Sequence, residues 1–270
     1  MKQIPNLFTL LNLIFGCIAI VLIMQTNESI ISLDNLGATQ IMLPERLWEG
    51  SLFIFGAAII DFLDGFLARL FRATSDMGKQ LDSLSDVVSF GVAPGMIIYQ
   101  LLRMSYAQQE NGLNTPAWLL VPSFIFSAAA AWRLAKFNIS SNQTVHFRGV
   151  PSPAAGLLVA SFPLILSLSH PLISIQALLI NKWVLYLIVI VISYLMICNR
   201  PFMALKFKDY SIKNNGSKYL LLVLSLLSII LLQWMAIPAI FILYVIISLF
   251  IREPDEKTVH KNRDTLDMTV

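Results

Sequence analysis

Charged residues are scarce in this chain. Of its 270 residues only 13% are charged, whereas 57% are hydrophobic and the mean hydropathy is +0.72. An ordinary soluble domain carries about 25% charged residues, so this chain has too few of them to cover a soluble globule. The composition therefore argues against a soluble enzyme, a disordered chain and a coiled coil. It indicates an all-α polytopic membrane protein, much of whose surface faces lipid.

Cysteine and histidine are scarce as well. The two cysteines, Cys17 and Cys198, lie far apart in sequence, each within an apolar run. This arrangement does not favour a disulfide or a metal–thiolate site, and we expect both side chains to be buried as small apolar groups. The three histidines are isolated from one another, so the sequence contains no paired-histidine metal motif.

Eight apolar runs are long enough to cross a bilayer, which takes about 20 residues per helix. The first run has no small-residue cleavage site after Met24, and we interpret it as a retained span. A very tight turn near Pro238 is expected to join the last two spans. The predicted spans are residues 7–24, 47–67, 87–102, 118–134, 153–168, 183–198, 219–235 and 237–251.

Basic residues are distributed unevenly between the two sides of the membrane. With eight spans, both chain ends lie on one side, and only Arg46, Arg103 and Lys182 of the 19 basic residues fall on the other. Cytoplasmic loops carry an excess of Lys and Arg, so both termini are predicted to be cytoplasmic, in the cell (inner) membrane. Topology signalling and attraction to anionic lipid account for most of these basic residues.

Four aspartates lie at or near the predicted cytoplasmic ends of the second and third spans: Asp61, Asp64, Asp82 and Asp86. The first two are three positions apart and the last two are four apart, so each pair shares one helix face. An unpaired carboxylate in a membrane helix costs about 2.5–3.5 kcal/mol on insertion scales. Cations must offset this charge, and all-oxygen ligands suit Mg²⁺ or Mn²⁺. Two carboxylate pairs can hold two such ions, an arrangement suited to in-line displacement at phosphorus.

The sequence around these aspartates resembles a known family signature. It reads Asp61-x2-Asp64-Gly65-x2-Ala68-Arg69-x8-Gly78-x3-Asp82-x3-Asp86. This pattern resembles the signature of the CDP-alcohol phosphotransferases, and it matches that signature at every defined position and in every gap. The resemblance implies a core of six transmembrane helices with a binuclear metal site at the cytoplasmic membrane boundary. It also implies transfer of a substituted phosphoryl group from a CDP-linked lipid to an alcohol, with release of CMP.

The resemblance further implies roles for the individual signature residues. Asp61, Asp64 and Asp82 are expected to be metal ligands. Asp86 is expected to be both a metal ligand and the catalytic general base that accepts the proton of the acceptor hydroxyl. The expected nucleotide-binding residues are Asp61, Gly65, Ala68, Arg69, Gly78 and Asp82, with Arg69 near the phosphates.

Segments outside the signature resemble the serine-using branch of this family, the bacterial and archaeal phosphatidylserine synthases. They are residues 4–12, 133–138 and 147–155. Two positions depart from the customary form, since Lys136 replaces an arginine and Val150 a leucine. The resemblance implies CDP-diacylglycerol and L-serine as substrates, no nucleic acid and a homodimer. We expect a catalytic core in residues 1–200, a basic loop with two further helices in 201–252 and a polar tail in 253–270.

The same segments offer groups that could bind the acceptor. The carboxylate of serine needs a basic partner, and Arg133, Lys136 and Arg148 lie in one predicted cytoplasmic connection. Topology signalling explains these three residues almost equally well. Asn6 and Thr9, near the start of the first helix, are expected either to contact the nucleotide or to cap the helix.

Two alternative functions stay open at this point. The same chemistry could use another alcohol, such as glycerol phosphate or inositol phosphate. A cation-coupled transporter could also place carboxylates in the membrane, but it would more often have repeated halves with matching broken helices. All four aspartates lie in one stretch without a counterpart in the second half, which favours an enzyme.

Overall fold

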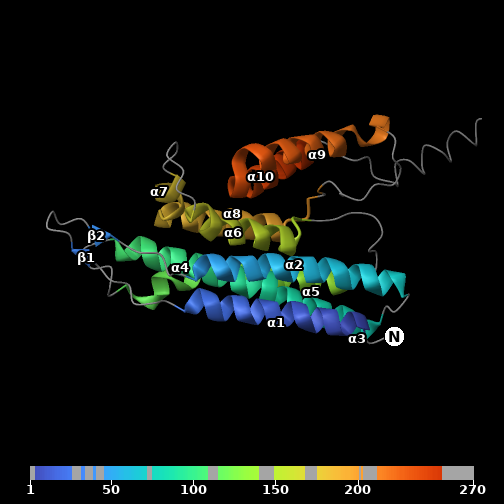
Figure 1. Cartoon of the computed structure of the whole chain (residues 1–270), viewed down its shortest axis with the longest axis horizontal. Helices are drawn as coiled ribbons and strands as arrows, with labels where there is room; N and C mark the ends of the chain where they lie inside the picture. Colours follow the sequence, from blue (N-terminus) through green and yellow to red (C-terminus); the bar gives the residue numbers. More distant parts are fainter. Residues whose placement is uncertain are drawn as a thin grey trace, which may run out of the picture. The chain divides into compact units, whose positions relative to one another are not determined.

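The computed structural model describes residues 4–25, 32–33, 39–40, 46–71, 75–108, 115–139, 149–167, 175–200, 202 and 212–250 (Figure 1). The chain divides into two compact units. The first comprises Met1–Ile139 and Val150–Ile197, and the second comprises Ser140–Gly149 and Cys198–Val270. Each unit is described by itself.

The described part of the first unit consists mainly of helices. A two-residue antiparallel pair, β1 (Ser32–Leu33) and β2 (Thr39–Gln40), lies between α1 and α2. The helices are α1 (Ile4–Met24), α2 (Leu47–Leu70), α3 (Asp76–Asp86), a π-helical segment (Val87–Val92), α4 (Ala93–Ala107), two 3-10 turns (Ala117–Leu119 and Val121–Ser123), α5 (Phe124–Ile139), α6 (Ser152–Leu166), α7 (Ile175–Leu179) and α8 (Lys182–Ile197).

Helices α1 and α2 form a closely packed antiparallel pair. A Cβ added to Gly50, near the start of α2, would lie 3.0 Å from the backbone oxygen of Ala19 in the second half of α1. A Cβ added to Gly56, further along α2, would lie 2.8 Å from the Phe15 ring. Glycine lets the two backbones approach because it has no side chain to separate them. The end of α2 therefore lies beside the start of α1, as Figure 1 shows.

Helices α3 and α4 run parallel to α1 and are hydrogen-bonded to its backbone. The Ser85 hydroxyl donates to the Thr9 carbonyl oxygen at 3.0 Å, and the Gln100 amide donates to the Ile23 carbonyl oxygen at 3.0 Å. Both donors are buried. Buried polar side chains need such partners, because neither lipid nor apolar side chains can replace the hydrogen bonds that water would make.

The third span differs from its prediction of residues 87–102, because one continuous helical stretch extends over Asp76–Ala107. The polar residues of α3 concealed its first part from a search for apolar runs. In the middle, the backbone widens into the π-helical segment, where the Ala93 amide donates to the Val88 carbonyl five residues earlier. Pro94 lies just beyond and has no amide hydrogen to donate. The Ser127 hydroxyl of α5 donates to the Gly91 carbonyl at 2.9 Å and so satisfies part of this irregular backbone.

Helix α6 begins where the proline pair of its sequence predicted a helix start. Pro151 precedes the helix and Pro153 occupies its first turn. Gly156 then packs against the π-helical segment, since an added Cβ would lie 2.9 Å from the Phe90 carbonyl oxygen. Helix α6 is thereby held close to the end of α3 that carries Asp86.

The second unit contains α9 (Ile212–Leu232), a 3-10 turn (Gln233–Met235) and α10 (Ala236–Phe250). Helices α9 and α10 pack against each other (Figure 1). The predicted turn near Pro238 was wrong by a few residues. The chain turns at Gln233, whose φ is 50°, and Pro238 lies in the first turn of α10, where a missing amide hydrogen costs nothing.

The all-α polytopic membrane fold is confirmed. In the described part of the chain, five helices are long and apolar enough to cross a membrane, and Ser152–Leu166 and Lys182–Ile197 are shorter apolar helices. Large apolar side chains such as Ile59 and Leu187, 63% and 60% exposed, face outward, as expected where lipid is the solvent. The expectation of buried cysteines was wrong for the same reason. Cys17 is exposed on the outer face of α1, and Cys198 is half-buried.

Candidate metal centre

The four aspartates of the signature come from two helices. Helix α2 carries Asp61 and Asp64 one turn apart, and α3 carries Asp82 and Asp86 in the same way. Carboxylate oxygens of Asp61, Asp64 and Asp82 all lie within 4.8 Å of one another. This is a spacing at which one ion can bridge side chains from both helices.

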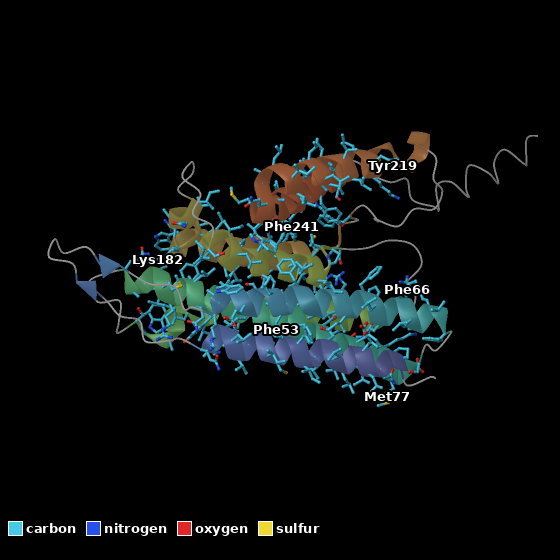
Figure 2. All side chains as sticks on the ribbon, in the orientation of Figure 1. Phe53, Phe66, Met77, Lys182, Tyr219 and Phe241 are labelled. Carbon is cyan, nitrogen blue, oxygen red and sulfur yellow. The ribbon has the colours of Figure 1, made fainter. Side chains whose placement is uncertain are left out.

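The cluster lies toward one end of the first unit. Figure 2 shows Phe66 of α2 and Met77 of α3 at the same end, and Lys182 of α8 at the opposite end. Phe66 and Met77 are 48% and 66% exposed, so this end has an apolar rim beside the carboxylates. The aspartates thus lie nearer to the end of these helices that carries Phe66 and Met77 than to the end marked by Lys182.

Asp86 lies beside the group of three and is, with Asp64, one of the two most buried of the four aspartates. Its side chain is only 7% exposed, whereas Asp61 and Asp82 are half-buried. It is close enough to the other three carboxylates to interact electrostatically with each of them. The four carboxylates therefore form one cluster, in which Asp64 and Asp86 are buried and Asp61 and Asp82 are half-buried.

The cluster contains a buried oxygen that calls for a cation. Oδ2 of Asp64 is buried and has no hydrogen-bond partner. Carboxylates at this separation also repel one another, and the repulsion is strong where water is excluded. Divalent cations would satisfy the oxygen and neutralise the charge. The all-oxygen donor set fits hard ions such as Mg²⁺ or Mn²⁺ better than zinc.

Helix α1 places two polar side chains, three residues apart, beside α3 and α2. A Cβ added to Gly78 of α3 would lie 3.0 Å from Oδ1 of Asn6. The Thr9 hydroxyl donates to the Pro5 carbonyl at 3.1 Å and also interacts with Asp64. Thr9 therefore does not cap α1, because its hydroxyl bonds to a carbonyl within the helix instead of accepting from a free amide.

The remaining signature residues flank the cluster on α2. A Cβ added to Gly65 would meet no atom within 4 Å, so this side of the helix is open. Ala68 is half-buried, and Arg69 is exposed with its Nε donating to the Gly65 carbonyl at 2.9 Å. This hydrogen bond holds the guanidinium along α2, beside the open face.

The three basic residues expected to bind the acceptor differ in what the structure shows of them. Arg133 of α5 is half-buried and donates from Nη1 to the Ser152 hydroxyl at the start of α6, at 3.3 Å. Lys136 is exposed. Arg148 lies outside the described residues. Near the same end of α5, Asn138 donates to the Ser83 hydroxyl of α3 at 2.8 Å and so connects this helix to the aspartate helix.

One buried residue at the centre was missed in the sequence analysis. Asn12 of α1 donates from Nδ2 to Oδ1 of Asp86 at 3.4 Å and is completely buried. A polar amide within an otherwise apolar span is a signal that could have identified it. Its partner could not be read from the sequence, because Asp86 is 74 positions away.

The fold and this site together define a polytopic helical membrane protein that carries a cluster of four aspartates on two neighbouring helices. Comparison with known families specifies it further. The family described as CDP-alcohol phosphatidyltransferase matches residues 2–193, and the chain belongs to this family. Membership confirms the resemblance of the signature, and it decides for a membrane transferase and against the transporter alternative.

Several characterised proteins are similar to this chain. A CDP-diacylglycerol–serine O-phosphatidyltransferase of Bacillus subtilis is 33% identical over 165 residues, which cover 60% of this chain and 77% of the relative. One of the same name from Methanocaldococcus jannaschii is 38% identical over 128 residues, 47% of this chain and 56% of the relative. An archaetidylserine synthase of Methanothermobacter thermautotrophicus is 35% identical over 133 residues, 47% of this chain and 53% of the relative.

Proposed function

We propose that the protein transfers the phosphatidyl group of CDP-diacylglycerol to the hydroxyl of L-serine, giving phosphatidylserine and CMP. The observation that supports this most is the cluster of Asp61, Asp64 and Asp82, whose carboxylate oxygens lie within 4.8 Å of one another beside the buried Asp86. The names of the similar proteins, which include several serine transferases, support serine as the acceptor.

Two divalent cations would be held by the four aspartates, with Asp61, Asp64 and Asp82 as ligands and Asp86 completing the set. When bound, such ions neutralise the diphosphate of the CDP-linked lipid and stabilise the negative charge that develops on the leaving CMP. The open face of α2 at Gly65, with Arg69 beside it, is where the nucleotide and its phosphates would lie. Asn6, Thr9, Ala68 and Gly78 would complete this pocket.

In the proposed reaction, the protein itself accepts the proton that the acceptor hydroxyl loses. The serine hydroxyl attacks the phosphorus that bears the diacylglycerol, a new P–O bond forms, and the bond to CMP breaks. Asp86 accepts the hydroxyl proton, since an alcohol is not acidic enough to react quickly without a base. Its burial keeps water, which would hydrolyse the lipid substrate, away from the reacting oxygen.

The most direct test is product analysis with a panel of alcohols. Purified protein is incubated with CDP-diacylglycerol, Mn²⁺ or Mg²⁺, and labelled serine, ethanolamine, glycerol phosphate or inositol phosphate. Lipid products are then separated by thin-layer chromatography. We expect phosphatidylserine as the main product. Preferential incorporation of glycerol phosphate or inositol phosphate would disprove the serine assignment and leave the metal-site chemistry intact.

Replacement of a basic residue should separate acceptor binding from lipid binding. If Arg133 binds the serine carboxylate, R133A loses a charge-assisted hydrogen bond of about 1.5–3 kcal/mol, so its KM for serine should rise roughly 10–150-fold. Its KM for CDP-diacylglycerol should change much less. Ethanolamine, which has no carboxylate, should be a poor acceptor for the wild type. Lys136→Ala and Arg148→Ala test the other two candidates in the same assay.

The matched control for this series is R103A, because Arg103 is exposed near the end of α4 away from the aspartates. Its kinetic constants should equal those of the wild type. A rise confined to the KM for CDP-diacylglycerol in R133A, with discrimination against ethanolamine unchanged, would instead assign Arg133 to the lipid phosphate.

The proposal places the site on the cytoplasmic side of the cell (inner) membrane, with both termini in the cytoplasm. It also includes the predicted homodimer and the division into a catalytic core before residue 200 and two further helices after it. Orientation is supported by Arg46, Arg103 and Lys182, which lie at the starts of α2 and α8 and the end of α4, the ends remote from the aspartates.

Two glutamines near opposite ends of one helical stretch provide a matched test of this orientation. Gln80 of α3 and Gln108, just after α4, are both exposed. In a background with Cys17→Ala and Cys198→Ala, Q108C should react with an impermeant thiol reagent in intact cells. Q80C should react only after lysis. The opposite labelling pattern would invert the proposed topology.

A further inference from the structure

Asn12 is a buried amide that satisfies only one side of its hydrogen-bonding capacity. Its side chain has no solvent exposure, and Nδ2 donates to Oδ1 of Asp86 at 3.4 Å. Its own oxygen, Oδ1, is buried and has no hydrogen-bond partner. The amide orientation follows from chemistry, because the carbonyl side would be repelled by the carboxylate.

An unsatisfied oxygen at this position lowers stability, because it loses its hydration and gains no partner. Leucine has nearly the same shape as asparagine and would avoid that cost in a buried, apolar span. The hydrogen bond to Asp86 is the interaction that leucine could not make. Costly local features of this kind occur at functional sites, where geometry matters more than stability.

The backbone around Asn12 is fixed on both sides of Asp86. Ser85, just before Asp86, donates to the Thr9 carbonyl, and Ser89, one turn after it, donates to the Asn12 carbonyl, each at 3.0 Å. Gly16 brings α1 against Ser89, since an added Cβ would collide with that serine. These contacts set the register of α1 against α3 and the π-helical segment, and so they fix where the Asn12 amide points.

We propose that Asn12 is a positioning residue for the base of the transfer reaction. Its Nδ2 donates to Oδ1 of Asp86, which restrains rotation of the carboxylate and leaves the other oxygen to face the acceptor hydroxyl. The inference rests on the proposed function in that Asp86 is taken as the base, but it does not depend on serine as the acceptor. Asn12 acts through Asp86 and need not contact either substrate.

The test compares N12L with Q100L in purified protein in detergent. Gln100 is a suitable control, because it is another buried amide that joins α4 to α1, at 1% exposure, and it contacts the Ile23 carbonyl far from the aspartates. For N12L we expect kcat to fall roughly 10–150-fold, the range for loss of a hydrogen bond to a charged group. The KM for CDP-diacylglycerol should stay unchanged, and the melting temperature should not fall. Q100L should show the reverse, a lower melting temperature with unchanged kcat.

N12A provides a second variant if N12L does not fold, because the smaller side chain fits the same space. A kcat equal to that of the wild type in either variant would overturn the inference. So would a loss of activity that only parallels a loss of melting temperature. Asp86→Asn, assayed beside them, separates the test of Asp86 as the base from the test of Asn12 as its positioning residue. If that variant is fully active, the proposed base is wrong, whereas an inactive Asp86→Asn with a fully active N12L refutes the role of Asn12 alone.

Discussion

Turnover is expected to stop when a chelator removes divalent cations from the purified protein, and to return when Mg²⁺ or Mn²⁺ is added. The reason lies in the charge of the cluster. Asp61, Asp64 and Asp82 place carboxylate oxygens within 4.8 Å of one another, and Oδ2 of Asp64 is buried without a partner. Without cations the diphosphate of the lipid substrate would add further negative charge to this site and be repelled.

Single replacements should have the same effect as the chelator. D61A, D64A and D82A each remove one ligand of the proposed centre, so each should abolish product formation while the protein still inserts into the membrane. D76A is the matched control. Asp76 is exposed in the first turn of α3, outside the cluster, and its replacement should leave activity unchanged. Full activity in excess chelator would refute the metal-dependent mechanism, whatever the variants show.

Replacement of Asp86 by asparagine should separate its role as base from its role as ligand. The amide keeps the shape and one oxygen ligand but cannot accept a proton. Transfer should fall by at least about 10²-fold, the lower end of general-base contributions. CDP-diacylglycerol should still bind, because the three ligands Asp61, Asp64 and Asp82 are intact.

The measurement has two parts, a rate with labelled acceptor and an equilibrium binding curve for CDP-diacylglycerol in the presence of Mn²⁺. Asp82→Asn, one turn away on the same helix, is the informative comparison, because it should weaken metal dependence as well as rate. Near-wild-type turnover in Asp86→Asn would move the base elsewhere. Loss of lipid binding together with loss of rate would show that Asp86 acts mainly through the metals.

Local sequence was sufficient for the aspartate cluster. Each pair lies one turn apart on its own helix, and the two helices are joined by a short connection, so few arrangements could keep them far apart. Hydropathy likewise predicted the apolar helices, because lipid selects long apolar runs whatever their neighbours. The family assignment had the same basis, since the signature lies within 61–86 and depends on no distant contact.

The ends of the helices and the exposure of individual side chains were less predictable from the sequence. The start of the third span was placed at residue 87, although its helix begins at Asp76, because the polar residues of α3 lower the hydropathy of the first part of this helical stretch. Cys17 was expected to be buried but is exposed. An apolar environment can be lipid as well as protein, and composition does not distinguish the two.

The amino-acid sequence alone therefore determined the class of protein, most of its apolar helices and its cluster of aspartates, all of which depend on patterns within one helix or two successive ones. Only the tertiary structure decided what surrounds Asp86. Asn12 reaches it from 74 positions away, and Ser89 bonds to the backbone of α1 across 77 positions. Such contacts depend on the register between packed helices. This register results from the fit of many side chains and of close glycine contacts, so no local sequence pattern specifies it.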